Sequence, residues 1–89
     1  MIDIEIIWSR LKEHAGEEFL TKLGEPFTYN LEGGIFRPEG KNRQAGKRDF
    51  VTALKLVPFE GPGVINKITQ CPAYIYGVLH DQRIRRSDW

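Results

Sequence analysis

Cysteine and histidine are scarce in this sequence, and their scarcity restricts the chemistry it can support. One cysteine, Cys71, and two histidines, His14 and His80, occur among the 89 residues. A single cysteine excludes an intramolecular disulfide and a cysteine-based zinc site, and two distant histidines do not form a metal-binding motif. We therefore expect no metal, no cofactor and a fold that is stabilised by packing alone.

Long apolar runs are also missing. No stretch approaches the roughly 20 apolar residues that a membrane-spanning helix needs. The N-terminal sequence, Met1 to Glu5, lacks the positive charge with which a secretory signal begins. These features predict a soluble, cytoplasmic protein without a membrane partner.

Catalytic motifs are equally few. Gly33-Gly34 is expected to be a hairpin turn, and Gly61-Pro62-Gly63 lacks both the preceding strand and the lysine-serine or lysine-threonine pair of a phosphate-binding loop. His80 and Asp81 are adjacent, so on a helix their side chains diverge and do not form a relay. Cys71 lies at a predicted helix start, where the dipole lowers the pKa of a thiol, or it is a small buried residue there. No base is placed beside it, so we expect a protein that is not an enzyme and has no catalytic residue.

The composition is that of one globular domain. Apolar residues make up 40% of the chain and charged residues 28%, which is near the average for globular proteins. A chain of 89 residues has room for one hydrophobic core. We therefore interpret residues 1–89 as a single domain.

Helical periodicity occurs in four segments, each with apolar residues on one face. The first spans residues 3–14. The second spans residues 46–57. A short segment at 62–68 and a last one at 72–80 both begin with proline, which is favoured at the first helical position. Residues 82–89 are expected to form a tail.

The strands are predicted between the first two helices. Apolar and polar residues alternate in segments 19–23, 27–31 and 35–37. Gly33-Gly34 supplies the positive φ angles that a tight hairpin turn demands. The expected result is a three-stranded antiparallel meander.

Together these elements predict an α+β fold. An N-terminal helix precedes a three-stranded antiparallel β-meander, which is followed by three helices packed on one face of the sheet. The expected core consists of the inward-facing apolar residues Ile4, Ile7, Trp8, Leu11, Phe19, Phe27, Tyr29, Leu31, Phe50, Leu54, Ile65, Ile68, Ile75 and Leu79.

Residues 64–80 contain two helical segments separated by a short break. This spacing resembles a helix-turn-helix, in which the second helix lays exposed side chains against base edges in the major groove. The resemblance implies base contacts from Gln70, Tyr74 and Tyr76 and a phosphate contact from Lys67. The alternative is a pair of short packed helices with no role in nucleic-acid binding.

Charge is distributed unevenly, although the net charge is only +1. Residues 1–39 contain four basic and eight acidic side chains, a net charge of −4, whereas residues 40–89 contain nine basic and four acidic ones, a net charge of +5. A basic loop and a basic tail supply most of this positive charge: Lys41, Arg43, Lys47 and Arg48 in the loop, and Arg83, Arg85 and Arg86 in the tail. If these side chains gather on one face, they would bind phosphates in a salt-sensitive way. If they are scattered, they are solvated surface charges.

These observations predict a small non-enzymatic binding module. Nucleic acid is the first candidate partner, through the helix pair and the two basic segments. The alternative is a protein–protein interaction or homodimerisation domain, because two tryptophans, three tyrosines and five phenylalanines are many for so small a core. The candidates for that interface are Trp8, Phe36, Phe59 and Trp89.

Overall fold

The N-terminal helix forms as its periodicity predicts. In the computed structural model, which describes residues 3–89, helix α1 spans Ile4–Glu13. The Asp3 carboxylate caps it by accepting a hydrogen bond from the backbone N–H of Glu5 at 2.9 Å. Ile7 and Leu11 are fully buried and Trp8 is nearly so, so the face with apolar spacing is the face that packs on the core.

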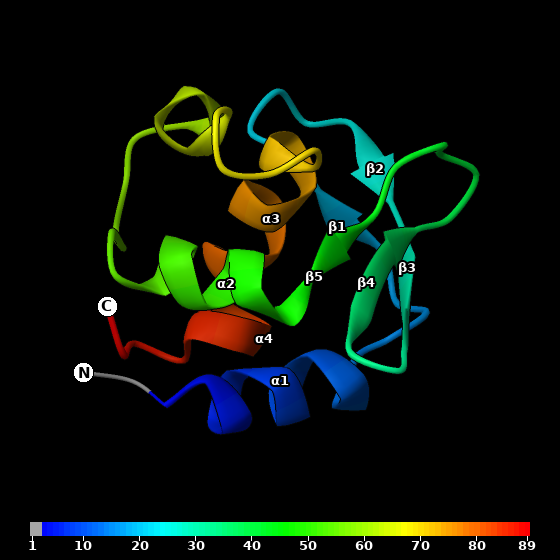
Figure 1. The fold of residues 1–89 in the computed structure, drawn as a ribbon, viewed down its shortest axis with the longest axis horizontal. Coiled ribbons are helices and arrows are strands. Elements are labelled where there is room, and N and C mark those ends of the chain that lie inside the picture. The colour runs from blue at the N-terminus through cyan, green and yellow to red at the C-terminus, as the bar shows by residue number, and fades with distance from the viewer. Residues whose placement is uncertain (1–2) are drawn as a thin grey trace.

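Two antiparallel sheets follow α1 (Figure 1). In the smaller sheet, β1 (Phe19–Leu20) pairs with β2 (Pro26–Phe27). The larger sheet is a meander of β3 (Tyr29–Glu32), β4 (Ile35–Pro38) and β5 (Ala45–Gly46), in that order. The predicted three-stranded meander is therefore present, but its third strand is β5.

The segment 19–23, predicted as the first strand of the meander, instead contributes β1 to the separate sheet. Its strand lasts two residues because the chain turns at once: the N–H of Thr21 donates to the carbonyl oxygen of Glu25, and that of Gly24 to Thr21. The hairpin at Gly33-Gly34 is confirmed. Both glycines have positive φ angles, of 56° and 80°, as a tight two-residue turn requires.

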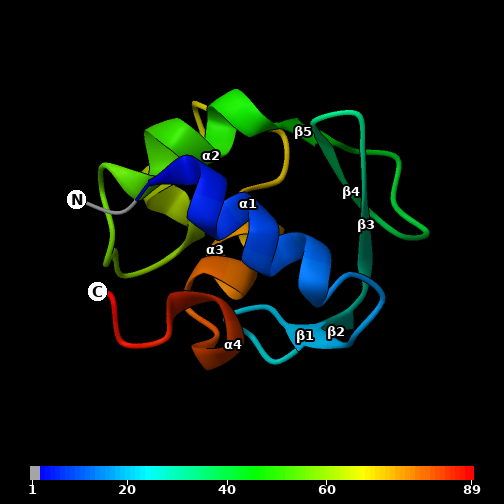
Figure 2. The ribbon, with the colours of Figure 1, turned by 90° about the horizontal axis from the view of Figure 1, so that it is seen from below.

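The later helices surround α3, which lies in the middle of the molecule (Figures 1 and 2). Helix α2 spans Lys47–Leu54, η1 is a 3-10 helix at Pro62–Ile65, and α3 spans Pro72–Leu79. Helix α3 packs against η1 and β1, while α2 packs against α1. The α+β class and the order of helix, sheet and later helices are those that the sequence predicts.

The tail is the main local difference from the sequence prediction. Residues Gln82–Arg85 form a fourth α-helix, α4, whose Asp81 cap accepts a hydrogen bond from the N–H of Arg83 at 2.9 Å. This short helix buries Ile84 completely and lies against α1. Periodicity over four residues is too short to identify such a helix, so its formation depends on the tertiary contacts of Ile84.

Aromatic rings make up much of the core. Tyr29 lies 4.8 Å from Phe36 between ring centroids, Phe36 lies 5.1 Å from Phe50, and Phe50 lies 5.4 Å from Trp8. The Tyr29 hydroxyl donates to the backbone carbonyl oxygen of Leu11 at 2.7 Å, so its burial leaves no unpaired polar atom. Burial also raises the pKa of Tyr29, which keeps the phenol protonated as a donor.

Most of the predicted core is buried, and the exception is Ile68, which is 36% exposed. Ile4, Leu31 and Leu54 are partly buried at its margin. The predicted core set omits the buried residues Phe36, Ala45, Ala53, Phe59, Cys71, Val78 and Ile84.

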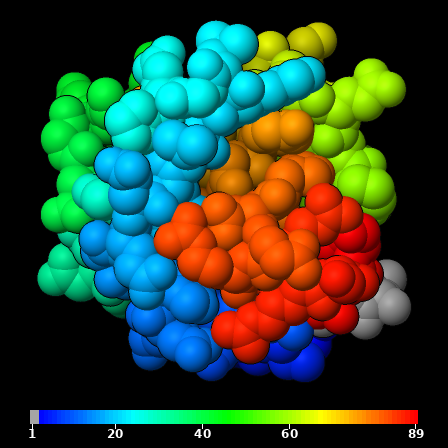
Figure 3. Space-filling view, turned by 180° about the vertical axis from the view of Figure 1, so that it is seen from behind, coloured from blue at the N-terminus to red at the C-terminus, as the bar shows by residue number. Residues whose placement is uncertain are grey.

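The C-terminal segment is folded back onto the domain. The Trp89 indole N–H donates to the carbonyl oxygen of Leu79 at 2.9 Å. Arg10 of α1 donates to the carbonyl oxygen of Ile84 at 2.8 Å and pairs with Asp88 at 2.6 Å. Figure 3 shows this segment, in orange and red, covering the face between α1 and the β1 region. Across residues 3–89, no helix has the length and apolar character needed to span a bilayer.

Candidate functional site

The two elements of the predicted helix pair are present as η1 and α3. Every residue of α3 is buried or half-buried, because η1, β1 and α4 pack around it. A recognition helix needs a free face that can enter the major groove. Helix α3 lacks such a face, so the fold does not support major-groove reading through residues 64–80.

Tyr74 and Tyr76 direct their rings into the domain. Tyr74 makes an edge contact with Phe27, with 5.0 Å between centroids. Tyr76 stacks on His80 at 4.4 Å and contacts Phe59 at 5.8 Å. Both rings are half-buried and pack against the core, so much of the surface that base stacking would need is already in contact with partners within the chain.

The tail arginines are also engaged within the chain. Arg83 pairs with Glu17 at 3.1 Å and Asp81 at 2.9 Å, and its guanidinium lies 3.8 Å from the centroid of the Phe19 ring. Arg86 pairs with Glu13 at 3.1 Å. Arg85 donates to the carbonyl oxygen of Trp89. These contacts attach the tail to α1 and the segment after it, away from the basic loop (Figures 1 and 2).

These ion pairs also affect the pKa of the acids they contain. Burial opposes ionisation of Asp81, but its hydrogen bonds from Arg83 outweigh that effect and hold the pKa of Asp81 below its usual range. Hydrogen bonds from His14 and Arg83 lower the pKa of Glu17. Both carboxylates therefore stay charged at neutral pH, and the tail contributes little free positive charge.

Four other basic side chains differ from the tail arginines in their ion pairing. Most ion pairs within residues 3–89 join side chains of α1, α4 and the segments that these helices contact. One further pair joins Lys47 to Glu5 at 2.7 Å. None of them includes Arg37, Lys41, Arg43 or Lys67. These four exposed side chains therefore carry positive charge that no carboxylate of the described chain neutralises in a direct pair.

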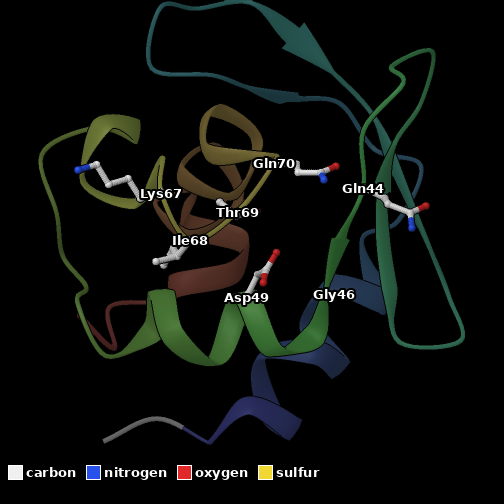
Figure 4. Close-up of a pocket in the computed structure, with 7 residues that line it drawn as sticks. All are labelled: Gln44, Gly46, Asp49, Lys67, Ile68, Thr69 and Gln70. Carbon is white, nitrogen blue, oxygen red and sulfur yellow. The ribbon is translucent and has the colours of Figure 1, made fainter.

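The four cations line two neighbouring surface hollows that we together call the polar groove. Arg37, Lys41 and Arg43 line one hollow, and Lys67 lines the other, which is drawn in Figure 4. The polar groove consists of these two hollows, of about 440 and 450 Å³, which share Gln44 and Gln70. It runs between the loop before β5 and the segment joining η1 to α3. Its lining is Arg37, Lys41, Asn42, Arg43, Gln44, Gly46, Asp49, Lys67, Ile68, Thr69 and Gln70.

Two hydrogen bonds hold the walls of the polar groove. Arg43 donates from the loop to the backbone carbonyl oxygen of Gln70 at 3.2 Å. Arg37, on the outward face of β4, donates to the side-chain oxygen of Gln44 at 3.0 Å. Each guanidinium has further N–H groups after these bonds, so both retain donors for a ligand.

The polar groove contains four of the eleven predicted nucleic-acid-binding residues: Lys41, Arg43, Lys67 and Gln70. Lys47 is paired with Glu5 and lies near the Trp8 ring, and Arg48 is exposed at the start of α2 outside the lining. The sequence prediction missed Arg37, Asn42, Gln44 and Asp49. Successive side chains of a strand point to opposite faces of the sheet, so Arg37, next to the apolar Phe36, is expected to point outward. This expectation follows from the sequence alone.

Cys71 is not an activated thiol. Its side chain is fully buried at the start of α3, and burial raises the pKa of Cys71 to about 11. The expectation that the helix dipole lowers this pKa is wrong, because burial destabilises the charged thiolate more than the dipole at the helix start stabilises it. The alternative interpretation, a small buried residue at the helix start, is confirmed.

His80 is held as a neutral ring. Its Nδ1 bonds the carbonyl oxygen of Tyr76 at 3.0 Å, and its Nε2 accepts a hydrogen bond from the N–H of Phe59 at 3.3 Å. A nitrogen that accepts a hydrogen bond carries no proton, so Nδ1–H is the donor to Tyr76. Burial lowers the pKa of His80 below its ordinary value of 6.5.

The folded state should therefore lose stability on mild acidification. Below the ordinary histidine pKa the unfolded chain takes up a proton at His80 that the folded chain does not, so the free energy of unfolding falls between about pH 7 and about pH 5. Urea unfolding at several pH values measures this slope. In His80→Gln the slope over that interval should be smaller. Glu17 and Asp81, whose pKa values are lowered, change stability only at lower pH. A pH slope that is the same in His80→Gln as in the wild-type chain would contradict the role of His80.

The aromatic residues proposed for a protein interface are all engaged in the core. Phe36 is fully buried, Trp8 and Phe59 are more than nine-tenths buried, and Trp89 packs against the core from the C-terminus. Trp8, Phe36 and Phe59 are therefore too deeply buried to form an interface, and Trp89 packs back onto the domain. The large apolar side chains that remain most exposed are Leu23, Leu20 and Val64.

Within residues 3–89, no group of three or more histidine, cysteine, aspartate or glutamate side chains is arranged to hold a metal ion. Comparison with protein-family models, with curated proteins and with solved structures finds no match for this chain. The chemistry of the polar groove is therefore the basis for a functional proposal.

Proposed function

We propose that this chain is a non-enzymatic module that binds nucleic acid in the polar groove. The observation that carries the proposal is a group of four exposed cations without carboxylate partners among the described residues. Arg37, Lys41 and Arg43 line one hollow of the polar groove, and Lys67 lines the adjoining one. Lysine and arginine bind phosphate oxygens, and binding releases the counterions that surround a nucleic acid.

The charge of the groove favours a polyanion although the whole chain is nearly neutral. Its lining has four basic side chains and one acidic one, Asp49, which gives a local charge of +3. Most acidic residues lie elsewhere, and several of them are paired with the tail arginines. The remaining lining is rich in amides, namely Asn42, Gln44 and Gln70. Amides both donate and accept, as binding to sugars and base edges requires.

A salt titration with matched variants tests the proposal. Labelled single-stranded and duplex oligonucleotides are titrated at several salt concentrations. In Lys41→Gln/Arg43→Gln, affinity at low salt should fall on the order of tenfold, and the slope of log K against log salt should become shallower by about 1.4 for a single strand, because each phosphate contact contributes about 0.7.

The matched control is Lys12→Gln/Lys55→Gln. It removes the same charge from exposed lysines outside the groove, so it should leave the salt slope nearly unchanged. Absence of binding at low salt, or an equal loss in the two double variants, would overturn the proposal. Competition by polyglutamate as effective as competition by an oligonucleotide would instead identify a general site for acidic polymers, and would also overturn it.

A further inference from the structure

The polar groove is not uniform in charge along its length. One hollow is lined by Arg37, Lys41 and Arg43, together with amide side chains. The other holds the only carboxylate of the lining, Asp49, together with Lys67, Thr69 and Gln70, and Figure 4 shows the Lys67 side chain directed away from Asp49. The groove therefore has one end suited to a phosphate and a second end that presents a charged hydrogen-bond acceptor.

Asp49 is available to a ligand. It lies in the first turn of α2, and Figure 4 shows its carboxylate pointing from the helix into the hollow toward the Thr69–Gln70 segment. It takes part in none of the ion pairs formed within residues 3–89. The nearby Gln70 is exposed, and its backbone oxygen is fixed by Arg43.

An ionised carboxylate only accepts hydrogen bonds, so its ligand must donate. It also repels phosphate, so the part of a nucleic acid that reaches Asp49 is a sugar hydroxyl or a base, and of these only the base differs between sequences. Adenine, cytosine and guanine carry an exocyclic amino group that donates to such an acceptor, whereas uracil presents two carbonyl oxygens around its single N–H. An unpaired strand leaves the whole edge of a base free for this contact and allows the base to turn out of the strand into a hollow.

We infer that Asp49 and Gln70 read an unpaired base that bears an exocyclic amino group, while Arg37, Lys41 and Arg43 hold the adjoining phosphates. This inference rests on the proposed function and specifies its ligand as a single strand that contains cytosine, adenine or guanine. The residues of both ends come from elements far apart in the sequence, β4 with its following loop, α2, and the connection before α3.

Fluorescence anisotropy with oligomers of one length, oligo-C, oligo-A and oligo-U, tests the inference. The wild-type chain should bind oligo-C and oligo-A about tenfold more tightly than oligo-U, which corresponds to one well-formed base contact. Asp49→Asn should reduce that ratio toward one. Because loss of a negative charge strengthens all phosphate binding, the ratio, and not the affinity, is the measure.

Two further variants separate the possible causes. Asp49→Ser keeps a residue that suits a helix start, and should also reduce the ratio if Asp49→Asn fails to fold by circular dichroism. Glu25→Gln removes an exposed carboxylate outside the groove and should leave the ratio unchanged. A wild-type ratio of one, or a ratio that survives both Asp49 variants, would overturn the inference while the proposed function stands. Absence of binding to all three oligomers would overturn the proposed function itself.

Discussion

Ile84→Ala is expected to lower the free energy of unfolding by roughly 2–5 kcal/mol, the range for truncating a fully buried isoleucine. Ile84 is completely buried, although it belongs to a helix of only four residues. Helix α4 packs on α1 and α3, so truncation leaves a cavity that neighbouring elements cannot readily fill. Urea denaturation monitored by tryptophan fluorescence measures the loss.

The control for this variant is Ile6→Ala. Ile6 lies on α1 with its side chain 46% exposed, so the same truncation should change stability by about 0.5 kcal/mol or less. Equal effects of the two substitutions would show that the C-terminal segment is not part of the cooperative fold. A large effect at Ile84 alone would show that residues 82–89 are needed to complete the core.

The tail shows where sequence reasoning reached its limit. The periodic segments at 3–14, 46–57 and 72–80 were long enough to predict helices, and the helices lie within one to three residues of those bounds. Segment 82–89 was too short and too basic to show a pattern. Its structure depends on Ile84 and Trp89, which meet distant parts of the chain. Such contacts leave no periodic signal.

The sequence predicts only those parts of the sheet that a turn motif or an alternating residue pattern determines. Gly33-Gly34 specified the β3–β4 hairpin through its turn geometry. Alternation also identified Phe19 and Phe27 as inward-facing residues, and they are opposite each other in the register of β1 with β2. The third strand of the meander could not be found, because Ala45-Gly46 is too short to alternate and pairs with β4 through a loop.

The candidate site was predicted in part because charge is visible in a sequence but pairing is not. Lys41, Arg43 and Lys67 were recognised as basic and remain without carboxylate partners among residues 3–89. Arg83 and Arg86 were equally basic, but the fold places glutamates beside them. The two groups of cations therefore have different roles: the tail group stabilises the contact with α1, and the groove group stays available to a ligand.

Gly77→Ala should destabilise the protein by about 1–3 kcal/mol, the usual cost of overpacking. Gly77 lies in the interior of α3, where alanine would normally be the better residue by about 1 kcal/mol. A Cβ atom at this position would lie 2.6 Å from the backbone carbonyl oxygen of Leu20 and 3.1 Å from the Phe27 ring. The backbone oxygen cannot move without displacing β1, so steric strain should exceed the gain in helix propensity. Thermal and urea unfolding measure the difference.

Gly63→Ala is the matched control for this substitution. Gly63 lies in η1, and a Cβ atom there has no heavy atom within 4 Å. Alanine should be neutral or slightly stabilising at that site, by roughly 0.4–1 kcal/mol, because it reduces the freedom of the unfolded chain. If Gly77→Ala were as stable as Gly63→Ala, α3 would not lie against β1 as closely as the structure has it. A loss at Gly77 alone would establish that glycine is required where the central helix meets the smaller sheet.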